Sequence, residues 1–209
     1  MDVPTTDGLN MFLISKATKK YGFKVSLSGL GGDEILRGYP SFNQLPKLLS
    51  AVQTLNLSKN LETKLRNFIY PIIRNYTSPK YASLLEYGSK IEDAFFLRRA
   101  LFMPWEINSD NNKYLNDDLQ IESVMNENDL INFKRINCTS TQITILELMF
   151  YTQPQLLRDA DWTSMSQSLE IRVPLLDTFL FEEILFLLHK SPDLKKGQIA
   201  KHIPNFPSH

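Results

Sequence analysis

The stretch KVSLSGLGGDEILRGYPSF, residues 24–42, constrains the fold more than any other part of this sequence. It opens with a short apolar run of strand length and passes at once into a loop rich in glycine, which ends in two adjacent acids. In parallel α/β sheets, ligands bind beyond the carboxyl ends of the strands. The loop is therefore predicted to lie at the ligand-binding edge of such a sheet.

The residues of this loop are typical of a site for phosphate and metal. Glycines let the backbone approach a ligand closely, and a nest of amide N–H groups binds phosphate oxygens. A carboxylate that follows can hold the Mg²⁺ bound to those oxygens, which makes Asp33 the candidate metal ligand and Glu34 its neighbour at the start of a helix. The alternative is an ordinary tight turn with Asp33 as a helix cap. The spacing matches neither the dinucleotide fingerprint nor a Walker loop.

The rest of the chain predicts helices and hardly any strand. Thr6 or Asp7 is predicted to cap a helix that runs through residues 9–21, with Gly22 just past its end. Further helices are predicted over residues 45–55, 60–76, 89–103, 139–153, 155–169 and 179–190, with Pro71 bending or ending one, Pro154 ending another, and 171–177 forming an extended turn. The polar stretch 107–120 predicts loops around a short helix. With one clear strand, the fold is either nearly all-α or contains part of a sheet.

Composition excludes several classes of protein. Lys+Arg and Asp+Glu both number 23, and this neutral balance disfavours a nucleic-acid partner. The single cysteine, Cys138, cannot form an intrachain disulfide and fits a reducing, cytoplasmic location. The sequence starts with no signal-peptide pattern, and its most apolar segment, 179–190, is too short and too charged to span a membrane and is predicted to be a buried helix. A length of 209 residues suits one sizeable domain, or one large and one small.

A second motif, LLRDADWTSMSQSLEIRVP at residues 156–174, gathers charges of both signs: Arg158, Asp159, Asp161 and Arg172. On a helix, Arg158 and Asp161 share a face. Such a set can recognise an amino acid, which has both a carboxylate and an amine, or it can be an internal salt-bridge network. Cys138 and the three histidines, which lie near the end of the chain, are assigned no catalysis.

Both motifs resemble signatures of the asparagine synthetase family. The first is similar to the family's loop, usually written leucine-serine-glycine-x-glycine-x-aspartate-glutamate and ending in glycine-tyrosine. The stretch LLRDADWTSMSQSLEIRVPLLD resembles the second signature, around arginine-valine-proline-x-leucine-aspartate. The resemblance covers most of residues 3–42 and 142–188, and the two motifs occur in the family's order.

The resemblance implies an α/β fold: a partial adenine-nucleotide-binding domain of the PP-loop ATP pyrophosphatase, Rossmann-like type, predominantly helical in this chain. It also implies a reaction, in which ATP adenylates the side-chain carboxylate of aspartate, pyrophosphate leaves, and ammonia attacks the acyl-adenylate. The cofactors would be ATP and Mg²⁺. By resemblance, the metal ligand would be Asp33, the catalytic residues Asp33, Glu34, Arg158 and Asp159, and the nucleotide- or pyrophosphate-binding residues Thr6, Ser28, Gly29, Leu30, Gly31 and Gly32.

The departures from the family's pattern predict a fragment that is not active alone. The family's serine-glycine-glycine-x-aspartate-serine loop and first strands would precede Val3, an N-terminal glutaminase domain would supply the ammonia, and the family's catalytic lysine has no clear place near the chain's end. Residues 1–42 would then be the end of the nucleotide-binding core, and 43–209 the helical remainder. Exposed strand edges would favour association, including a homodimer.

Two positions within the first motif also depart from the family. Leu30 stands where well-known members carry a glutamate, and a leucine at this position resembles a feature of members associated with polysaccharides. Arg37 stands where glycine is usual. Two alternatives therefore remain: a related amidotransferase that acts on another carboxylate in polysaccharide or β-lactam biosynthesis, and an inactive helical remnant that binds a partner.

Overall fold

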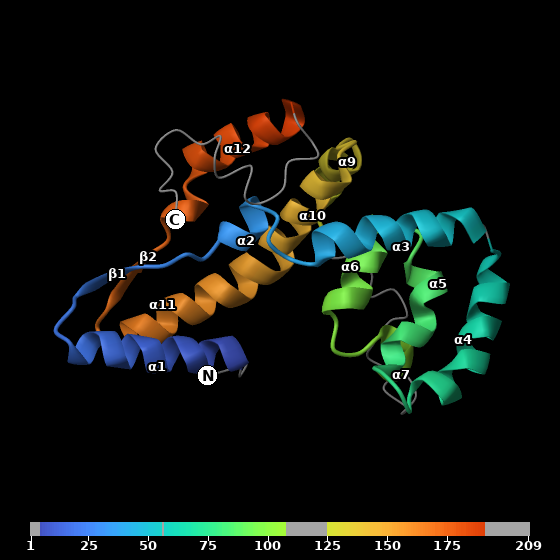
Figure 1. Cartoon of the computed structure of the whole chain (residues 1–209), viewed down its shortest axis with the longest axis horizontal. Helices are drawn as coiled ribbons and strands as arrows, with labels where there is room; N and C mark the ends of the chain where they lie inside the picture. Colours follow the sequence, from blue (N-terminus) through green and yellow to red (C-terminus); the bar gives the residue numbers. More distant parts are fainter. Residues whose placement is uncertain (1–4, 56, 108–124, 191–209) are drawn as a thin grey trace. The chain divides into compact units, whose positions relative to one another are not determined.

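A computed structural model describes residues 5–55, 57–107 and 125–190 of the chain. The backbone separates into two compact units (Figure 1), one formed by residues 1–39 and 144–209 and the other by residues 40–143. We call them the outer unit and the inner unit, after their places in the sequence. The described residues are mostly helical with one small parallel sheet, as the sequence predicted in outline. The functional division into 1–42 and 43–209 stays a prediction.

The outer unit is built from both ends of the described chain. Its elements are α1 (Thr6–Lys20), β1 (Val25–Leu27), α2 (Gly32–Ile35), η2 (Leu148–Leu157), α11 (Arg158–Met165), β2 (Glu170–Arg172), η3 (Pro174–Leu176) and α12 (Thr178–Lys190). Helix α10 (Thr139–Glu147) leads into η2. In Figure 1, α1 runs beside α11, and the two strands lie next to each other.

The sheet contains a strand that the sequence did not predict. β1 confirms the predicted apolar strand, and it pairs in parallel with β2, with Ser26 opposite Ile171. The prediction of an extended turn over 171–177 was therefore wrong in its first residues, which belong to β2. Three residues are too few for a periodic signal, and their strand conformation depends on pairing with a segment far away in the sequence.

The N-cap of α1 lies one residue before the earlier of its two predicted positions. Thr5, rather than Thr6 or Asp7, is the N-cap: its Oγ1 accepts a hydrogen bond of 2.8 Å from the amide of Gly8. A threonine in this position satisfies one of the amides that a helix leaves unpaired at its start. Gly22 was predicted correctly, since it follows the helix with φ of 85° and donates its amide to Lys19 O at 2.9 Å.

Pro154 does not end its helix, which contradicts the prediction. The chain stays helical from Thr139 to Met165, and residues 148–157 adopt the wider π-helical form with Pro154 inside it. A proline removes one backbone donor, yet helical structure continues on both sides of Pro154. A π-helix is rare and frequently occurs at functional sites.

The last helix, α12, is only half buried, whereas the sequence predicted a buried helix. Ile184 and Leu188 join Ile35 and Leu36 in the core of the outer unit. On the other face, Phe179 is 71% exposed and Phe186 is 56% exposed. Among the described residues, no helix combines the length and the apolar character needed to cross a membrane.

The inner unit is a helical bundle. Its elements are α3 (Ser41–Leu55), α4 (Lys59–Ile73), η1 (Pro79–Ser83), α5 (Leu84–Tyr87), α6 (Ile91–Arg99), α7 (Pro104–Ile107) and α9 (Glu127–Lys134). Pro71 was predicted to bend or end its helix, and α4 continues beyond it to Ile73. Buried side chains include Phe42, Leu45, Phe95, Leu97 and Ile143. The predicted loops over 107–120 lie, apart from residue 107, outside the described residues.

Candidate functional site

The glycine loop follows β1 directly, at the carboxyl end of the strand. The amide of Ser28 still belongs to the sheet, since it donates to Arg172 O at 2.8 Å. The loop then turns: the amide of Gly32 donates to Gly29 O at 3.1 Å, and the amide of Leu30 donates to Ser28 Oγ at 3.3 Å. The amides of Gly29 and Gly31 are not used in these turns, so a phosphate cradle in this loop would depend on them.

Gly31 is required by both its backbone angle and its surroundings. It has φ of 89° and ψ of −16°, which are the angles of the third residue of a type II turn. A Cβ added there would lie 2.4 Å from Leu176 Cδ2. A side chain would therefore be strained and would collide with η3. The conformation of the loop is thus constrained by its packing against Leu176 in η3, which follows the second sequence motif.

Asp33 lies on the first turn of α2, and its carboxylate is folded against the backbone of Gly38. The Asp33 backbone carbonyl accepts a 2.7 Å hydrogen bond from the Gly38 amide, and a Cβ added to Gly38 would lie 2.0 Å from Asp33 Oδ1. Arg37, just before it, has φ of 58°. This left-handed angle gives a physical reason why glycine suits position 37. As a whole residue, Asp33 is only partly buried.

Glu34 points into the protein rather than out of the loop. Its side chain is 1% exposed, and its Oε1 accepts hydrogen bonds from Tyr39 Oη at 3.0 Å and from Thr152 Oγ1 at 2.6 Å. Its backbone carbonyl accepts from Thr144 Oγ1 at 3.1 Å. Buried carboxylates need such donors, because desolvation is costly when they have none. Glu34 therefore fastens the glycine loop to α10 and η2. Tyr39 ends the family-like loop in the sequence, whereas no sequence pattern indicated Thr144 or Thr152.

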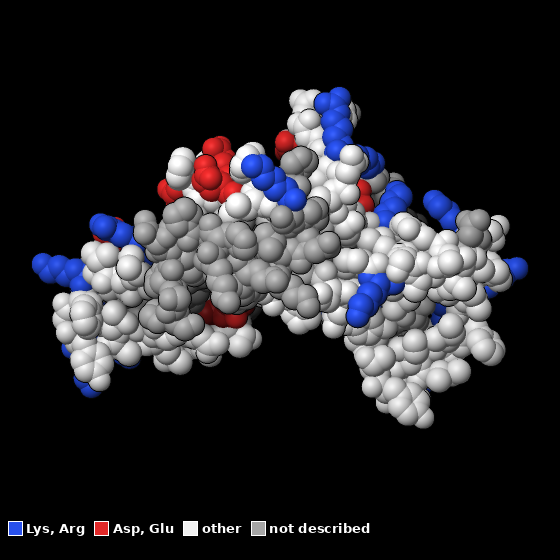
Figure 2. All heavy atoms as spheres, turned by 45° about the horizontal axis from the view of Figure 1, so that its top comes forward, with Lys and Arg blue, Asp and Glu red and all other residues white. Residues whose placement is uncertain are grey.

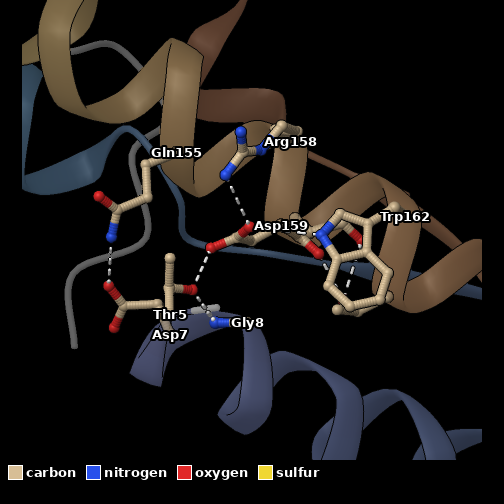
Figure 3. Close-up of polar contacts among 9 residues, drawn as sticks. Thr5, Asp7, Gly8, Gln155, Arg158, Asp159 and Trp162 are labelled. Atoms are coloured by element: carbon tan, nitrogen blue, oxygen red, sulfur yellow. Dashed lines mark hydrogen bonds and ion pairs between the residues drawn. The ribbon is translucent and has the colours of Figure 1, made fainter. Parts of the chain in front are cut away.

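Asp159 is the centre of a second polar cluster, shown in Figure 3. Its side chain is fully buried, and it accepts hydrogen bonds from the hydroxyl of Thr5 and, at 3.3 Å, from Trp162 Nε1. Arg158 Nη2 lies 3.7 Å from Asp159 Oδ1, with its side chain 47% exposed. Since Thr5 caps α1, Asp159 joins the start of α1 to α11.

Asp7 adds a polar contact that the sequence did not reveal. Its Oδ2 accepts hydrogen bonds from Tyr151 Oη and from Gln155 Nε2, both at 3.2 Å (Figure 3 shows the second). The ring of Tyr151 also makes an edge-on contact with Tyr39, with 6.4 Å between ring centroids. Tyr39 and Tyr151 therefore connect the Glu34 cluster to the start of α1. The π-helical segment η2 supplies both Tyr151 and its neighbour Thr152 to this connection.

The remaining predicted residues are placed less centrally. Thr6 is exposed on the first turn of α1, and it is its neighbour Thr5 that contacts Asp159. Asp161 is exposed, and the cation that shared its face in the prediction, Arg158, contacts Asp159 instead. Arg172 pairs with Glu170 at 2.8 Å on the surface of β2, with both side chains more than half exposed. The second motif is therefore not one ion-pair network.

The loop fits a Mg²⁺ ion with bound phosphate better than it fits a metal alone. Among the residues that the structure describes, no three His, Cys, Asp or Glu side chains gather into a metal-binding group. Mg²⁺ is usually held by one or two carboxylates together with substrate phosphates. Asp33, partly exposed beside the amides of Gly29 and Gly31, matches that kind of site, whereas Glu34 is engaged by two hydroxyls.

Each unit has a hollow in its surface. In the outer unit, a pocket of about 290 Å³ adjoins the glycine loop and is lined mainly by Ile35, Leu148, Leu157, Leu176 and Phe181, with Thr152 at its wall. In the inner unit, a groove of about 580 Å³ is lined by side chains of both charges. Lys and Arg side chains on the face in Figure 2 lie apart from one another rather than in a single patch.

Comparison with known proteins places the chain in a family. The family model for asparagine synthase matches residues 2–203, which is nearly the whole sequence. No curated protein and no solved structure matches the chain. The family consists of ATP-dependent ligases of the amidotransferase type. The two motifs identified in the sequence both fall within the matched residues, and the chain belongs to the asparagine synthase family.

Proposed function

We propose that the chain contributes to the synthetase reaction for which the family is named. ATP would adenylate the side-chain carboxylate of aspartate and release pyrophosphate, and ammonia would then attack the activated carbonyl to form the amide. The observation that carries the proposal is the position of the loop 28–33: it follows a parallel strand, its turn is fixed by Gly31, and Asp33 stands partly exposed beside it. Ligands in α/β proteins bind at this end of the strands.

In this proposal, each loop residue has a role that its geometry supports. The amides of Gly29 and Gly31 would donate to the oxygens of the leaving pyrophosphate, and Ser28 shapes the turn. Asp33 would hold Mg²⁺, which when bound neutralises charge on the phosphates. Glu34 would act by positioning the loop, since its carboxylate is buried and bonded to Tyr39 and Thr152.

The second motif has a mixed role in the proposal. Asp159 is fully buried and would hold α1 against α11 rather than contact substrate. Arg158 is half exposed and is the residue of this motif that could reach an anionic substrate. Thr6 stays proposed as a residue near the nucleotide. The pyrophosphate would leave from the loop, and the cytoplasm is the proposed location because a single cysteine cannot form an intrachain disulfide.

A second candidate keeps the chemistry and changes the acid. Leu30 is half-buried in the loop, and the nearby pocket is lined by five apolar side chains together with Thr152, Gln153 and Thr178. Apolar walls favour a substrate with an apolar body over aspartate, which has a charged group at each end. This arrangement supports a related amidotransferase that adenylates another carboxylate.

Pyrophosphate release separates these candidates. The chain is incubated with ATP, Mg²⁺ and one of a panel of acids that includes aspartate and more apolar carboxylates, with and without ammonia. Release that depends on the acid, is lost in Asp33→Asn and is kept by Glu182→Gln, a control exposed on α12, supports the assigned site. No release with any acid supports the prediction of a fragment that is not active alone. Release with aspartate alone supports asparagine synthesis, and release only with apolar acids supports the second candidate. Release that Asp33→Asn leaves unchanged contradicts the assigned site.

A further inference from the structure

The groove of the inner unit is built from one short part of the chain. Its lining comes from the end of α3, from α4 and α5, and from the start of α6, so that every lining residue lies between Val52 and Asp93. The side chain of Gln53 joins two of these elements, since its Nε2 donates to Ser89 O at 3.0 Å. The volume of about 580 Å³ falls within the range of sites for small molecules. The groove is therefore a candidate binding site whose described walls all belong to the inner unit.

Two neighbours orient Arg66 at the wall of this groove. Its Nη1 lies 3.2 Å from Glu86 Oε2, and the other oxygen of Glu86 accepts a 2.8 Å hydrogen bond from Thr63 Oγ1. The guanidinium also lies over the ring of Trp105, 4.8 Å from its centroid. Arg66 Nε is buried and has no hydrogen-bond partner among the described residues. A guanidinium has five N–H donors, so Arg66 retains donors for an anion in an orientation that its neighbours already fix.

Glu62 lies on the same face of α4, one helical turn before Arg66. Opposite charges at this spacing commonly form an ion pair, but Arg66 is turned toward Glu86 on α5 instead. Glu62 is partly buried in the lining of the groove, and within the described part of the chain no residue bonds to its carboxylate. The groove therefore offers one group for an anion and one for a cation, with about 6 Å between their Cβ atoms.

We propose that the groove binds a free α-amino acid, whose carboxylate contacts Arg66 and whose ammonium contacts Glu62. An amino acid carries both charged groups on one carbon, so it can reach two side chains that start one helical turn apart. A simple anion such as phosphate would face the charge of Glu62, and a simple cation would face that of Arg66. The side chains of Arg66 and Glu86 are only 17% and 15% exposed, so charges bound beside them are screened less than on an open surface.

The remaining lining predicts a preference among amino acids. Val52, Leu57 and Tyr87 supply apolar surface to the groove. Lys90 and Asp93 line it too, and both already interact with other residues. Burial of an apolar side chain against such a surface adds to affinity. We therefore expect leucine and phenylalanine to bind roughly tenfold or more tightly than glycine, which has no side chain to bury.

The fluorescence of Trp105 tests the binding, because this ring contacts Arg66 directly. The sequence has 2 tryptophans, so Trp105 is the only one left in the Trp162→Phe background. The full chain in this background is titrated separately with L-leucine, L-phenylalanine and glycine, and the same titrations are followed by calorimetry. We expect a saturable change in emission with the two apolar amino acids. Asp33→Asn should leave it unchanged, which separates binding in the groove from the function proposed for the glycine loop.

Matched variants and ligands test the two contacts separately. Glu62→Gln removes one charge and no bond between described residues, and it should weaken binding roughly tenfold or more. Arg66→Lys keeps the charge and loses the planar donors, so it should weaken binding as well. The control Lys64→Gln, exposed on α4 and outside the groove, should change nothing. Leucinamide, which has no carboxylate, and N-acetylleucine, which has no ammonium, should each bind roughly tenfold or more weakly than leucine.

Three results would each overturn the proposal. The first is that none of the three amino acids gives a saturable fluorescence change or a binding heat. The second is that leucinamide or N-acetylleucine binds as tightly as leucine, since the groove would then not read both charges. The third is an affinity for leucine that Glu62→Gln leaves unchanged.

Discussion

The two units of this chain hold themselves together in different ways. In the outer unit, the central polar contacts join residues far apart in sequence: Thr152 and Glu34 are 118 residues apart, and Thr5 and Asp159 are 154 apart. In the inner unit, Arg66 and Glu86 are separated by 20 residues. Contacts between distant segments have to offset a larger loss of chain entropy. The difference teaches that the candidate site is built where the chain closes its longest loops.

The comparison can be read experimentally because each unit has its own tryptophan. Trp162 lies in the outer unit and Trp105 in the inner unit, and the sequence has 2 in total. A Trp105→Phe background therefore reports the unfolding of the outer unit, and a Trp162→Phe background reports that of the inner unit. All stability predictions below refer to urea unfolding followed by fluorescence in the matching background.

The largest effect is expected at Asp159. Asp159→Ala removes a fully buried acceptor and leaves the Thr5 hydroxyl and the Trp162 ring N–H without it, so we expect a loss of about 3 kcal/mol in the stability of the outer unit. The matched change in the inner unit is Glu86→Ala, at the 3.2 Å pair with Arg66, where about 1 kcal/mol is expected because both side chains retain some exposure. Equal losses of stability for Asp159→Ala and Glu86→Ala would contradict the stated difference between the two units.

The next effect concerns the loop itself. Gly31→Ala puts a Cβ at φ of 89° and 2.4 Å from Leu176, and should cost about 2 kcal/mol in the outer unit. Gly29→Ala is the matched control, since nothing lies within 4 Å of the added Cβ, and it should change stability by less than about 0.5 kcal/mol. If the two alanines behave alike, the packing of the loop against η3 is not what fixes its shape.

A smaller effect sharpens the role of Glu34. Tyr39→Phe and Thr152→Val each remove one donor to Glu34 Oε1, and each should cost about 1 kcal/mol. The double variant should cost more than the sum, because it leaves that buried oxygen with neither hydroxyl. A double-mutant cycle in the Trp105→Phe background measures this. Strict additivity would show that the two hydroxyls do not share one carboxylate.

The smallest effect is a pH dependence in the inner unit. Lys80 is buried, and it donates to the backbone carbonyls of Arg98 and Ala100, both at 2.8 Å. Burial, followed by the charge of Arg98, lowers the pKa of Lys80 below its usual 10.5. The unfolded chain then binds more protons between the lowered pKa and 10.5, so Lys80 makes the inner unit gain stability as pH rises through that window. Lys80→Met should flatten this rise, and an unchanged slope would contradict it.

Much of the fold could be predicted from local signals in the sequence. The apolar periodicity of α1, α3, α4 and α12 and the glycine at position 22 were enough to predict those helices and one helix end. Local signals failed where pairing or packing with distant residues decides the conformation. The strand β2 exists by pairing with β1, which is far away in the sequence. The helix continues through Pro154 in the π-helical form, although the sequence predicted that it would end there.

The candidate site divides in the same way. Glycines and acids identify the loop itself, because the sequence shows directly where the backbone can adopt unusual angles and where negative charges lie. Four residues hold the loop: Tyr39, Thr144, Thr152 and Leu176. Tyr39 belongs to the end of the first motif, whereas the other three are residue types common in protein interiors and become informative only through their contacts with Glu34 and Gly31. Asp159 was visible in the sequence and was predicted to be catalytic. In the structure it is buried and bonded to Thr5 at the start of α1, so it contributes to the packing of α1 on α11. Its role in catalysis stays a prediction.

The central claim is that residues 28–33 bind pyrophosphate and Mg²⁺ through the loop amides and Asp33. Isothermal titration calorimetry of the chain with Mg²⁺-pyrophosphate and with Mg²⁺-ATP, beside Asp33→Asn and the exposed control Glu182→Gln, tests it most directly. The account predicts binding that Asp33→Asn abolishes and Glu182→Gln preserves. Binding that survives Asp33→Asn, or no binding of either ligand by the native chain, would contradict it.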